Sequence, residues 1–277
     1  MTMISIITAI YNQLGMNRLY YETVKENTDS DWELIIIDNG SDDGSAEFFE
    51  SLGDSRVRVV KNDGNYSYPY CQNVGIKEAK GDILAFLNND ILLSPHWDTR
   101  MLSILGKDGY EVLTLCSNDH MADRKEARHY NRRYKHRKYP MLSLFGARKG
   151  ILKACVSLTY GDWQRHCDKI WEKYGTRLVR GFAGSAVVMT RDAVEIFNGW
   201  DPAQQAADFD MYMRTCERWD SHGDICPMSL VAGVYHHHFS RLTARQKYPP
   251  FKDSANLVSL EDKWSKEQRD KYLSLME

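Results

Sequence analysis

The chain has 277 residues, 43% of them hydrophobic, a length that suits one domain with elaborations. Lys and Arg total 36 against 38 Asp and Glu, and the resulting net charge of -2 argues against a protein held on nucleic acid by its overall field. The six cysteines lie far apart without a C-x-x-C pair, which excludes a zinc ribbon or a dense disulfide framework and fits a reducing cytoplasm best.

The first half of the chain alternates between short apolar runs and amphipathic stretches. The opening residues run straight into a strand without a basic leader, and no stretch approaches the roughly 20 apolar residues that span a bilayer, so we expect a soluble or at most peripheral protein. Runs too apolar for half-exposed strands predict central strands at 4–9, 33–38, 57–60 and 83–87. Helices are predicted at 16–26, 45–52, 69–79 and 95–105, and a further strand at 112–116. This order predicts an α/β fold with a doubly wound, mostly parallel sheet flanked by helices.

The regular alternation breaks at about residues 118–180, which we interpret as an insertion within one domain of residues 1–240. Residues 123–138 contain eight Lys or Arg and two acidic residues. This segment is either a solvated charged helix or loop, or a basic lid that contacts an anionic acceptor or a membrane surface through residues 124–138. After the insertion we predict strands at 185–189 and 230–235 and helices at 191–197 and 208–219. Residues 241–277 are predicted as a partly helical extension packed on or beside the domain.

Polar side chains follow three of the predicted strands, at the edge where open α/β sheets bind ligands. The first strand ends in Thr8-Ala9-Ile10-Tyr11-Asn12, the second in Asp38-Asn39-Gly40-Ser41, and the fourth in Asn88-Asn89-Asp90. The chain has neither a dinucleotide fingerprint after a strand nor a P-loop, so a bound diphosphate must be neutralised in another way. A divalent cation on a carboxylate at the end of the fourth strand would serve.

These motifs, in this order, resemble the inverting, GT-A fold glycosyltransferases of family 2, including rhamnosyltransferase-like members. The resemblance covers most of residues 3–240 and rests on the segments 4–12, 34–45, 73–75, 81–90, 184–186 and 207–210 and on the histidines from position 236. It implies transfer of a sugar from a UDP-, dTDP- or GDP-linked donor to an acceptor hydroxyl of a glycan or glycolipid, with inversion. Synthesis of a bacterial surface polysaccharide or glycan is the setting that it suggests.

The resemblance also assigns roles to single residues. Tyr11 and Asp38 would contact the nucleobase, and Asn88 and Asp90 would face the ribose and the metal-bound diphosphate. The full set predicted for the nucleotide site is Thr8, Ala9, Tyr11, Asn12, Asp38, Ser41, Asn73, Asn88 and Asn89. Asp208 stands where the family places its catalytic base, although in isolation it could be a helix cap.

The predicted cofactor is a divalent metal, Mn²⁺ or Mg²⁺, bound by Asp90. His236 and His238 share one face of a predicted strand and are candidates to complete the metal shell, or form only a polar strand end. On the acceptor side we expect Gly184, Ser185, Trp200, Asp201 and Asp210. Of these, Trp200 and Asp201 could equally be core and cap, and Asp210 a first-turn carboxylate favoured by the helix dipole.

The sequence departs from the family pattern at three positions. Gln13 stands where many members carry Glu, Gln72 replaces a basic residue, and Asn88 replaces the first of two carboxylates in the metal motif. A non-catalytic module that binds a sugar nucleotide or a glycan is therefore the alternative function. A nucleotidyltransferase would need a Gly-rich basic loop after the first strand, and residues 9–14 contain none.

Overall fold

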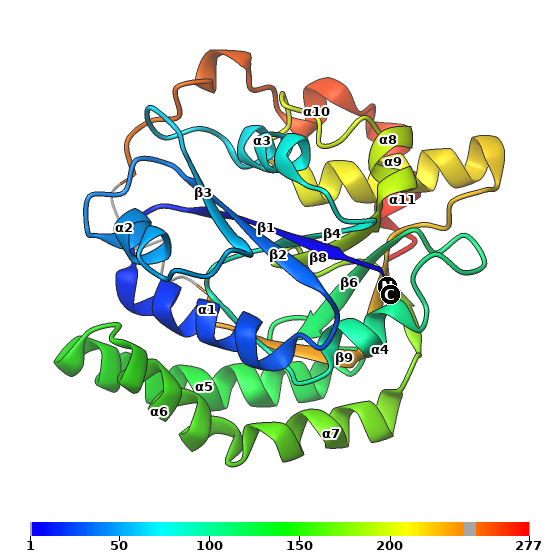
Figure 1. Ribbon diagram of the computed structural model, residues 1–277. Coiled ribbons are helices and arrows are strands. Elements are labelled where there is room, and N and C mark those ends of the chain that lie inside the picture. Colours follow the sequence, from blue (N-terminus) through cyan, green and yellow to red (C-terminus); the bar gives the residue numbers. More distant parts are fainter. Residues whose placement is uncertain (1, 241–247, 277) are drawn as a thin grey trace.

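The computed structural model describes residues 2–240 and 248–276, and within them a nine-stranded sheet crosses the middle of the molecule (Figure 1). The strand order is β3-β2-β1-β4-β8-β6-β9-β5, and β7 pairs with β9. The first four strands are parallel: β1 (Ile4–Ile10), β2 (Trp32–Asp38), β3 (Val57–Lys61) and β4 (Ile83–Leu87). The predicted α/β sheet flanked by helices is confirmed.

The second half of the sheet mixes strand directions. It contains β5 (Ile91–Leu93), β6 (Val112–Ser117), β7 (Leu178–Arg180), β8 (Ala186–Thr190) and β9 (Ser229–His238). Strand β8 runs antiparallel to both β4 and β6, whereas β6 and β9 are parallel. Because β8 is antiparallel, its first residues lie beside the last residues of β4, at the same edge of the sheet.

The central strands bury both of their faces, as the apolar runs predict. Along β1 and β2, alternate side chains enter two different hydrophobic clusters, with Ile6 and Leu34 in one and Ile7 and Ile35 in the other. The prediction of a central strand at residues 57–60 is wrong, because β3 is an edge strand that pairs only with β2 and its valines stay half-buried.

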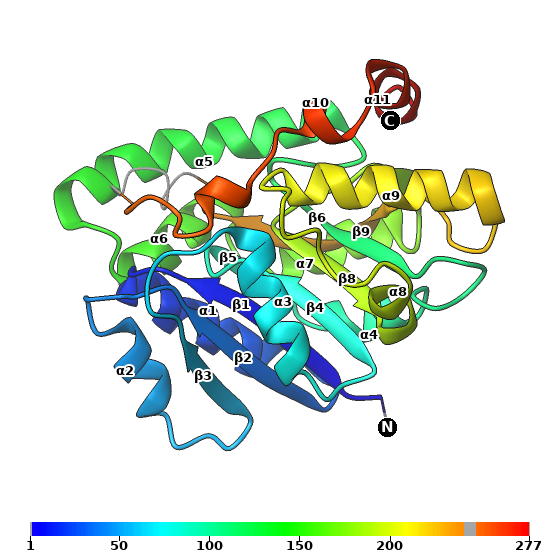
Figure 2. The ribbon, with the colours of Figure 1, turned by 90° about the horizontal axis from the view of Figure 1, so that it is seen from above.

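Helices cover both faces of the sheet (Figures 1 and 2). Those of the parallel half are α1 (Leu14–Asn27), α2 (Ser45–Glu50), α3 (Tyr68–Glu78) and α4 (Trp97–Leu102). Helices α8 (Arg191–Ile196) and α9 (Ala207–His222) lie with α3 on one face, and α1 lies on the other. All six were predicted near their observed bounds, whereas the short strands β5 and β7 were not predicted.

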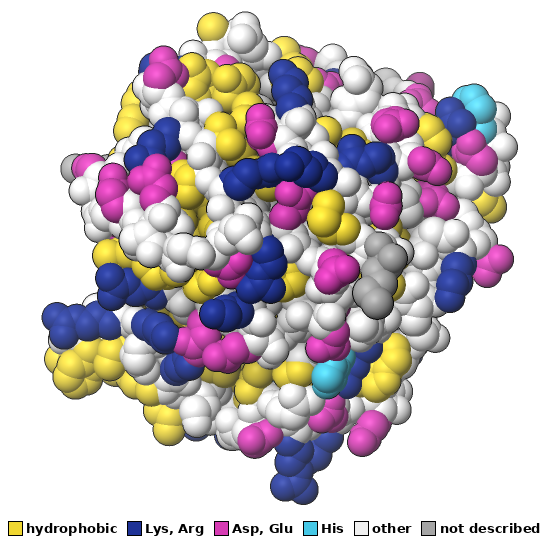
Figure 3. Space-filling model, viewed as in Figure 1, with side chains coloured by type: hydrophobic (Ala, Val, Ile, Leu, Met, Phe, Trp, Pro, Cys, Tyr) yellow, Lys and Arg dark blue, Asp and Glu magenta, His cyan; other side chains and the backbone are white. Residues whose placement is uncertain are grey.

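The insertion folds into α5 (Arg124–Phe145), α6 (Lys149–Tyr160) and α7 (Trp163–Tyr174), which lie on the α1 face of the sheet. Leu152 and Val156 of α6 pack with Met16 and Leu19 of α1 in one buried cluster. Helix α5 is mostly solvated on its outer side, as the charged-helix reading expects. Basic and apolar side chains protrude where α5 meets α6 (Figure 3), the apolar ones including Leu144, which is 75% exposed. Within the described ranges, no helix has the length and apolar character to cross a membrane.

The chain ends in η2 (Ser254–Asn256), α10 (Leu260–Lys263) and α11 (Lys266–Leu273), and Figure 2 shows α11 beside α9. Lys263 Nζ lies 2.6 Å from a carboxylate oxygen of Asp201 and 2.6 Å from one of Asp210. The Trp264 indole also donates a 2.8 Å hydrogen bond to Asp210. This part of the predicted extension therefore packs on the domain, and residues 241–247 of it lie outside the described residues.

Candidate active site at the carboxyl edge of the sheet

Segments distant in sequence meet where the parallel strands end. The Asn88 amide donates to the Ser185 carbonyl at 3.0 Å, which joins the end of β4 to the start of β8. The Phe239 amide donates to the Asp90 carbonyl at 2.8 Å, and the His238 amide donates to Asn118 Oδ1 at 2.7 Å. The ends of β4, β6 and β9 thus form one rim, as the predicted convergence of strand ends requires.

A cleft of about 510 Å³ opens along this rim and is called the strand-end cleft. Its lining residues are Ala9, Ile10, Tyr11, Asn39, Asn65, Tyr66, Tyr68, Asn88, Asn89, Asp90, Gln205, His238, Tyr248 and Phe251. Four nucleotide-site candidates (Ala9, Tyr11, Asn88, Asn89) and two metal-site candidates (Asp90, His238) are among them, so the structure brings these predicted residues together. 

Three further candidates brace the loop beside this cleft. The Asn12 amide donates to Ser41 Oγ at 2.8 Å, and the Asn12 side chain accepts from the Asp42 amide at the same distance. Asp38 is 3% exposed and its carboxylate accepts from the Ser41 amide. Asn12 adopts a φ of 57°, in the left-handed region that Asn tolerates better than most residues. These contacts fix the loop that carries Tyr11.

Thr8 and Asn73 lie in the framework instead. The Thr8 hydroxyl is fully buried, 2.6 Å from the Tyr20 hydroxyl. The Asn73 side chain donates to the Trp200 carbonyl at 2.7 Å and accepts from its amide at 2.9 Å. Because these polar atoms are occupied inside the protein, the structure does not bring either side chain to the cleft lining.

At the inner end of the cleft, His238 links two carboxylates. Its Nε2 lies 3.4 Å from Asp90 Oδ1, and its Nδ1 lies 3.0 Å from Asp119 Oδ2. Burial alone would lower the pKa of His238, but the neighbouring Asp90 and Asp119 carboxylates outweigh it and raise the pKa to about 10. Burial would raise the pKa of Asp90, yet the charge of His238 keeps it below its usual value. The ring and the carboxylates therefore hold one another in place.

The residues present fit a divalent cation in part. The described residues contain no cluster of three or more His, Cys, Asp or Glu side chains arranged to hold a metal. However, Asp90 Oδ1 and His238 Nε2 lie 3.4 Å apart, and the two side chains could hold one cation if the ion displaces the extra proton of the His238 ring. Asp119 holds the second ring nitrogen, as carboxylates do in the outer shell of many metal sites. The remaining ligands would come from the diphosphate and water.

His236, the other histidine candidate, has its hydrogen bond to a residue outside this pair. It is fully buried, and its Nε2 lies 2.8 Å from the Ser185 hydroxyl. Burial lowers the pKa of His236 to about 3, so the ring is neutral. Ser185, an acceptor-side candidate, is thereby committed to a buried hydrogen bond.

Asp208 lies in the first turn of α9, where the cap position is Ala206. Its Oδ1 accepts from the Phe209 amide at 2.9 Å, and its Oδ2 lies so close to Gly184 that a Cβ there would stand 2.1 Å away. Burial raises the pKa of the Asp208 carboxyl above the usual value, opposed by its hydrogen bonds to backbone amides and the charge of His120. Such a desolvated carboxylate at a cleft has the character of a general base.

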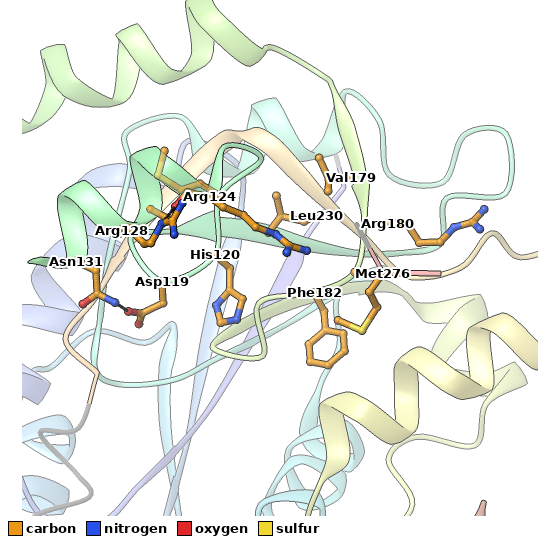
Figure 4. A pocket seen from close by; sticks show the side chains of 13 residues that line it. Asp119, His120, Arg124, Arg128, Asn131, Val179, Arg180, Phe182, Leu230 and Met276 are labelled. Carbon is orange, nitrogen blue, oxygen red and sulfur yellow. Dashed lines mark hydrogen bonds between the residues drawn. The ribbon is translucent and has the colours of Figure 1, made fainter. Parts of the chain in front are cut away.

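A second cleft, of about 650 Å³, lies beyond the ends of β6 and β7 (Figure 4) and is called the arginine cleft. Its lining residues are Asp119, His120, Met121, Arg124, Ala127, Arg128, Asn131, Val179, Arg180, Gly181, Phe182, Leu230 and Met276. Asp119 borders this cleft and also holds His238 of the strand-end cleft. The ring of Phe182 packs at 4.9 Å against that of Phe209, the neighbour of Asp208.

Asp208 lines neither cleft, but it lies near lining residues of both. Burial and then the charge of Asp208 raise the pKa of Tyr68, which lines the strand-end cleft. The charge of His120, which lines the arginine cleft, lowers the pKa of Asp208. The structure therefore places this carboxylate close to both clefts without placing it in the lining of either.

Three acceptor-side candidates are placed elsewhere. Trp200 is 1% exposed and packs in the core against Phe86. Asp201 and Asp210 both pair with Lys263, as described above. The structure does not bring these three to either cleft, and the core-and-cap reading of the sequence describes Trp200 better.

Sequence reasoning missed the aromatic wall of the strand-end cleft. Tyr66 and Tyr68 come from the segment after β3, where the run Tyr-Ser-Tyr-Pro-Tyr was a usable signal. Tyr248 belongs to the C-terminal segment, and its ring lies 5.1 Å from that of Tyr11. The Asn65 side chain donates to the Pro249 carbonyl at 2.6 Å, which holds this segment over the cleft. No local pattern reveals that contact, which spans 184 positions.

Comparison with known proteins gives one family. The model described as "Glycosyl transferase family 2" matches residues 5–158. Among curated relatives, the glycosyltransferase AglE of Haloferax volcanii is 31% identical in an alignment that covers 40% of this chain and 38% of the AglE chain. An undecaprenyl-phosphate 4-deoxy-4-formamido-L-arabinose transferase of Proteus mirabilis is 27% identical over 40% of this chain and 35% of its own. The chain thus spans well under half the length of both relatives.

Two solved structures share the fold. The mannosyltransferase PcManGT of Pyrobaculum calidifontis, solved in complex with GDP-Man and Mn²⁺, has a TM-score of 0.50 and 13% identity, covering 83% of this chain and 56% of its own. TarS of S. aureus has a TM-score of 0.52 and 10% sequence identity, and the match covers 85% of this chain and 60% of the TarS chain. At these identities the similarity shows the fold alone.

Proposed function

The chain belongs to glycosyl transferase family 2, and from this premise we propose that it transfers a sugar from a nucleoside-diphosphate sugar to an acceptor hydroxyl, with inversion. The observation that supports this most is Asp208, a carboxylate with a raised pKa that packs against the Gly184 backbone and lies near lining residues of both clefts. A donor in one cleft and an acceptor in the other would meet at this carboxylate.

The donor is assigned to the strand-end cleft. Tyr11 and Tyr248 both line the cleft and pack on each other with ring centroids 5.1 Å apart, so together they would offer one aromatic surface to the nucleobase. Asn88 and Asp90 line the same cleft and would face the ribose and the diphosphate. Thr8, Asp38, Ser41 and Asn73 would act indirectly, by holding the framework and the loop in position.

A divalent cation, Mn²⁺ or Mg²⁺, would neutralise the charge that develops on the leaving diphosphate when it is bound. Asp90 and His238 would hold it, and Asp119 would orient the His238 ring. The Mn²⁺ in the PcManGT complex supports this assignment by analogy of fold. His236 is not included, because its Nε2 faces Ser185.

Asp208 would act as the general base. It accepts the proton of the acceptor hydroxyl while that oxygen forms a bond to the anomeric carbon and the bond to the diphosphate breaks. The diphosphate leaves with the electron pair, and attack from the opposite side inverts the configuration. A raised pKa helps here, because a more basic carboxylate accepts the proton more readily, provided that the pH keeps it ionised. No second carboxylate is required to form a covalent intermediate.

The acceptor is assigned to the side of Asp208 that faces the arginine cleft, with the Gly184 backbone against the carboxylate. A glycan or glycolipid acceptor in bacterial surface polysaccharide or glycan synthesis, with the enzyme in the cytoplasm, is the biological setting that we propose. Peripheral membrane contact through residues 124–138 would use the basic outer side of α5.

A thermal-shift panel of UDP, dTDP and GDP, each with and without Mn²⁺, tests the donor site. A ligand at 100 times its Kd stabilises by about 2.7 kcal/mol, which for a chain of this size raises Tm by about 5 °C. We expect one nucleoside diphosphate to do this, and more strongly with Mn²⁺. No shift with any of them contradicts the proposal.

Donor hydrolysis then separates an enzyme from the alternative, a non-catalytic binding module. We expect slow release of the nucleoside diphosphate from its sugar conjugate, because water can replace the acceptor, and faster release with Mn²⁺. Binding without any turnover of the donor, with or without metal, would favour the binding module.

A further inference from the structure

The arginine cleft contains cationic side chains without ion-pair partners. Arg124 and Arg128 lie four residues apart on one face of α5, with Asn131 on the next turn. Across the described ranges, neither guanidinium lies within ion-pair distance of a carboxylate; Arg128 contacts only the Arg124 carbonyl of its own helix, at 3.2 Å. Figure 4 shows the Arg124 side chain extending over the cleft toward His120 and Phe182.

The acidic residues near these arginines have other partners. Asp119 accepts from the Asn131 side chain at 2.8 Å and contacts His238 at 3.0 Å. Glu126 pairs with Lys173 at 2.5 Å and accepts from the Tyr174 hydroxyl at 2.8 Å. Asp123 caps the first amides of α5. Among the described residues, no carboxylate therefore neutralises the positive charge of Arg124 and Arg128.

Part of the remaining wall of the arginine cleft is apolar. Met121, Val179, Leu230 and Phe182 contribute to them, and Phe182 packs against Phe209 beside Asp208. A molecule that fills this cleft would place an anionic group at the arginines and a less polar part against Phe182, with a neighbouring hydroxyl near Asp208.

We propose that the arginine cleft binds an acceptor that carries a phosphate group, held by Arg124 and Arg128. Two guanidinium groups one helical turn apart match the several oxygens of a phosphate, and each can make paired hydrogen bonds to it. This inference rests on the proposed function, because it names the acceptor class of the same site. It does not depend on which nucleotide the donor carries.

The test measures binding of sn-glycerol 3-phosphate by calorimetry, with the strand-end cleft filled by the nucleoside diphosphate that stabilises the protein most and Mn²⁺. Glycerol is the uncharged comparison. We expect the wild type to bind glycerol 3-phosphate and to bind glycerol much more weakly. The double variant Arg124→Gln/Arg128→Gln should lose at least about tenfold in affinity, since each hydrogen bond to a charged group contributes about 1.5–3 kcal/mol.

The matched control is Lys125→Gln/Arg133→Gln, which removes two positive charges from the same helix at positions outside the arginine cleft. It should bind glycerol 3-phosphate as the wild type does. An equal loss in both double variants means that only the overall field of α5 attracts the anion, and overturns the proposal. So does equal affinity of the wild type and the Arg124→Gln/Arg128→Gln variant.

Vesicles separate the two possible sources of the phosphate. Co-sedimentation with phosphatidylcholine vesicles that contain phosphatidylglycerol, reduced at least about tenfold more in Arg124→Gln/Arg128→Gln than in the control, assigns a lipid-linked phosphate. Binding of glycerol 3-phosphate without vesicle binding assigns a soluble one. A wild type that binds the nucleoside diphosphate but neither phosphate probe overturns this inference alone, whereas the absence of nucleotide binding contradicts the proposed function itself.

Discussion

The two clefts near Asp208 are built in different ways. In the strand-end cleft, the residues assigned to the ribose, the diphosphate and the metal directly follow β4, so the parallel sheet fixes their position. The arginine cleft combines the inserted helix α5, the short strand β7 and Met276 near the chain end. The comparison teaches that the diphosphate side of the donor site comes from the core of the fold, whereas the arginines assigned to the acceptor come from an addition to it.

The largest expected effect is at Asp208, the proposed general base. Asp208→Asn should lower turnover of the sugar nucleotide by about 10²–10⁴-fold, the usual contribution of a general base. Its effect on the thermal shift by the nucleoside diphosphate should be small, because the amide keeps the shape of the side chain. Asp192→Asn, on the exposed surface of α8, is the control. Turnover at the wild-type rate would remove Asp208 from the mechanism.

The same variant predicts an effect of pH. A base must be ionised, so activity should fall as the pH drops through a pKa above the usual range for Asp, and this limb should be absent in Asp208→Asn. Because the folded protein holds this proton more tightly than the unfolded chain, the protonated carboxyl stabilises the fold at pH values below the unfolded-state pKa. That stabilisation is lost as the pH rises through the folded-state pKa. At neutral pH Asp208→Asn should therefore raise Tm slightly while it removes activity. A lower Tm contradicts the assigned burial effect.

The next effect separates the clefts. Asp90→Ala should weaken Mn²⁺-dependent nucleotide binding by at least about tenfold, since even outer-shell changes at metal sites cost about 10–100-fold. Binding of sn-glycerol 3-phosphate in the absence of nucleotide should remain, because Asp90 does not line the arginine cleft. Loss of both ligands together would show that the clefts act as one site and would break the comparison.

The smallest expected effect is at the aromatic wall. Tyr248→Ala should weaken nucleotide binding by about 3–10-fold, because an aromatic contact contributes about 0.5–1.5 kcal/mol. Titration calorimetry with the stabilising nucleoside diphosphate measures this. Tyr139→Ala, a comparably exposed tyrosine on α5, is the control and should change nothing. Equal effects of the two variants would leave Tyr248 without a role in donor binding.

The sequence predicted the fold and the strand-end rim well because both depend on local patterns. Apolar runs identify β1, β2 and β4, and the residues that follow a parallel strand must lie at its carboxyl edge, as Asn88 and Asp90 do. Asp208 became a candidate only through the ordered family motifs. The edge position of β3 was missed because a valine-rich run has the same sequence pattern whether one or two neighbouring strands pair with it.

Contacts between distant segments were beyond the sequence. Asp119 was not a candidate, because only the folded sheet brings it to His238 across 119 positions. Tyr248 reaches Tyr11 for the same kind of reason. Asp201 and Asp210 were acceptor-side candidates, and only the folded chain shows that both of their carboxylates pair with Lys263.

The close approach of Gly184 to Asp208 limits how this protein can be redesigned. Any side chain at position 184 would have to displace the Asp208 carboxylate or the whole first turn of α9, because a Cβ would lie 2.1 Å from Oδ2. Helix α9 in turn carries Asp210, which is tied to the chain end. A library intended to alter acceptor preference should therefore keep this glycine invariant and vary α5, whose outward side chains can change without moving the backbone.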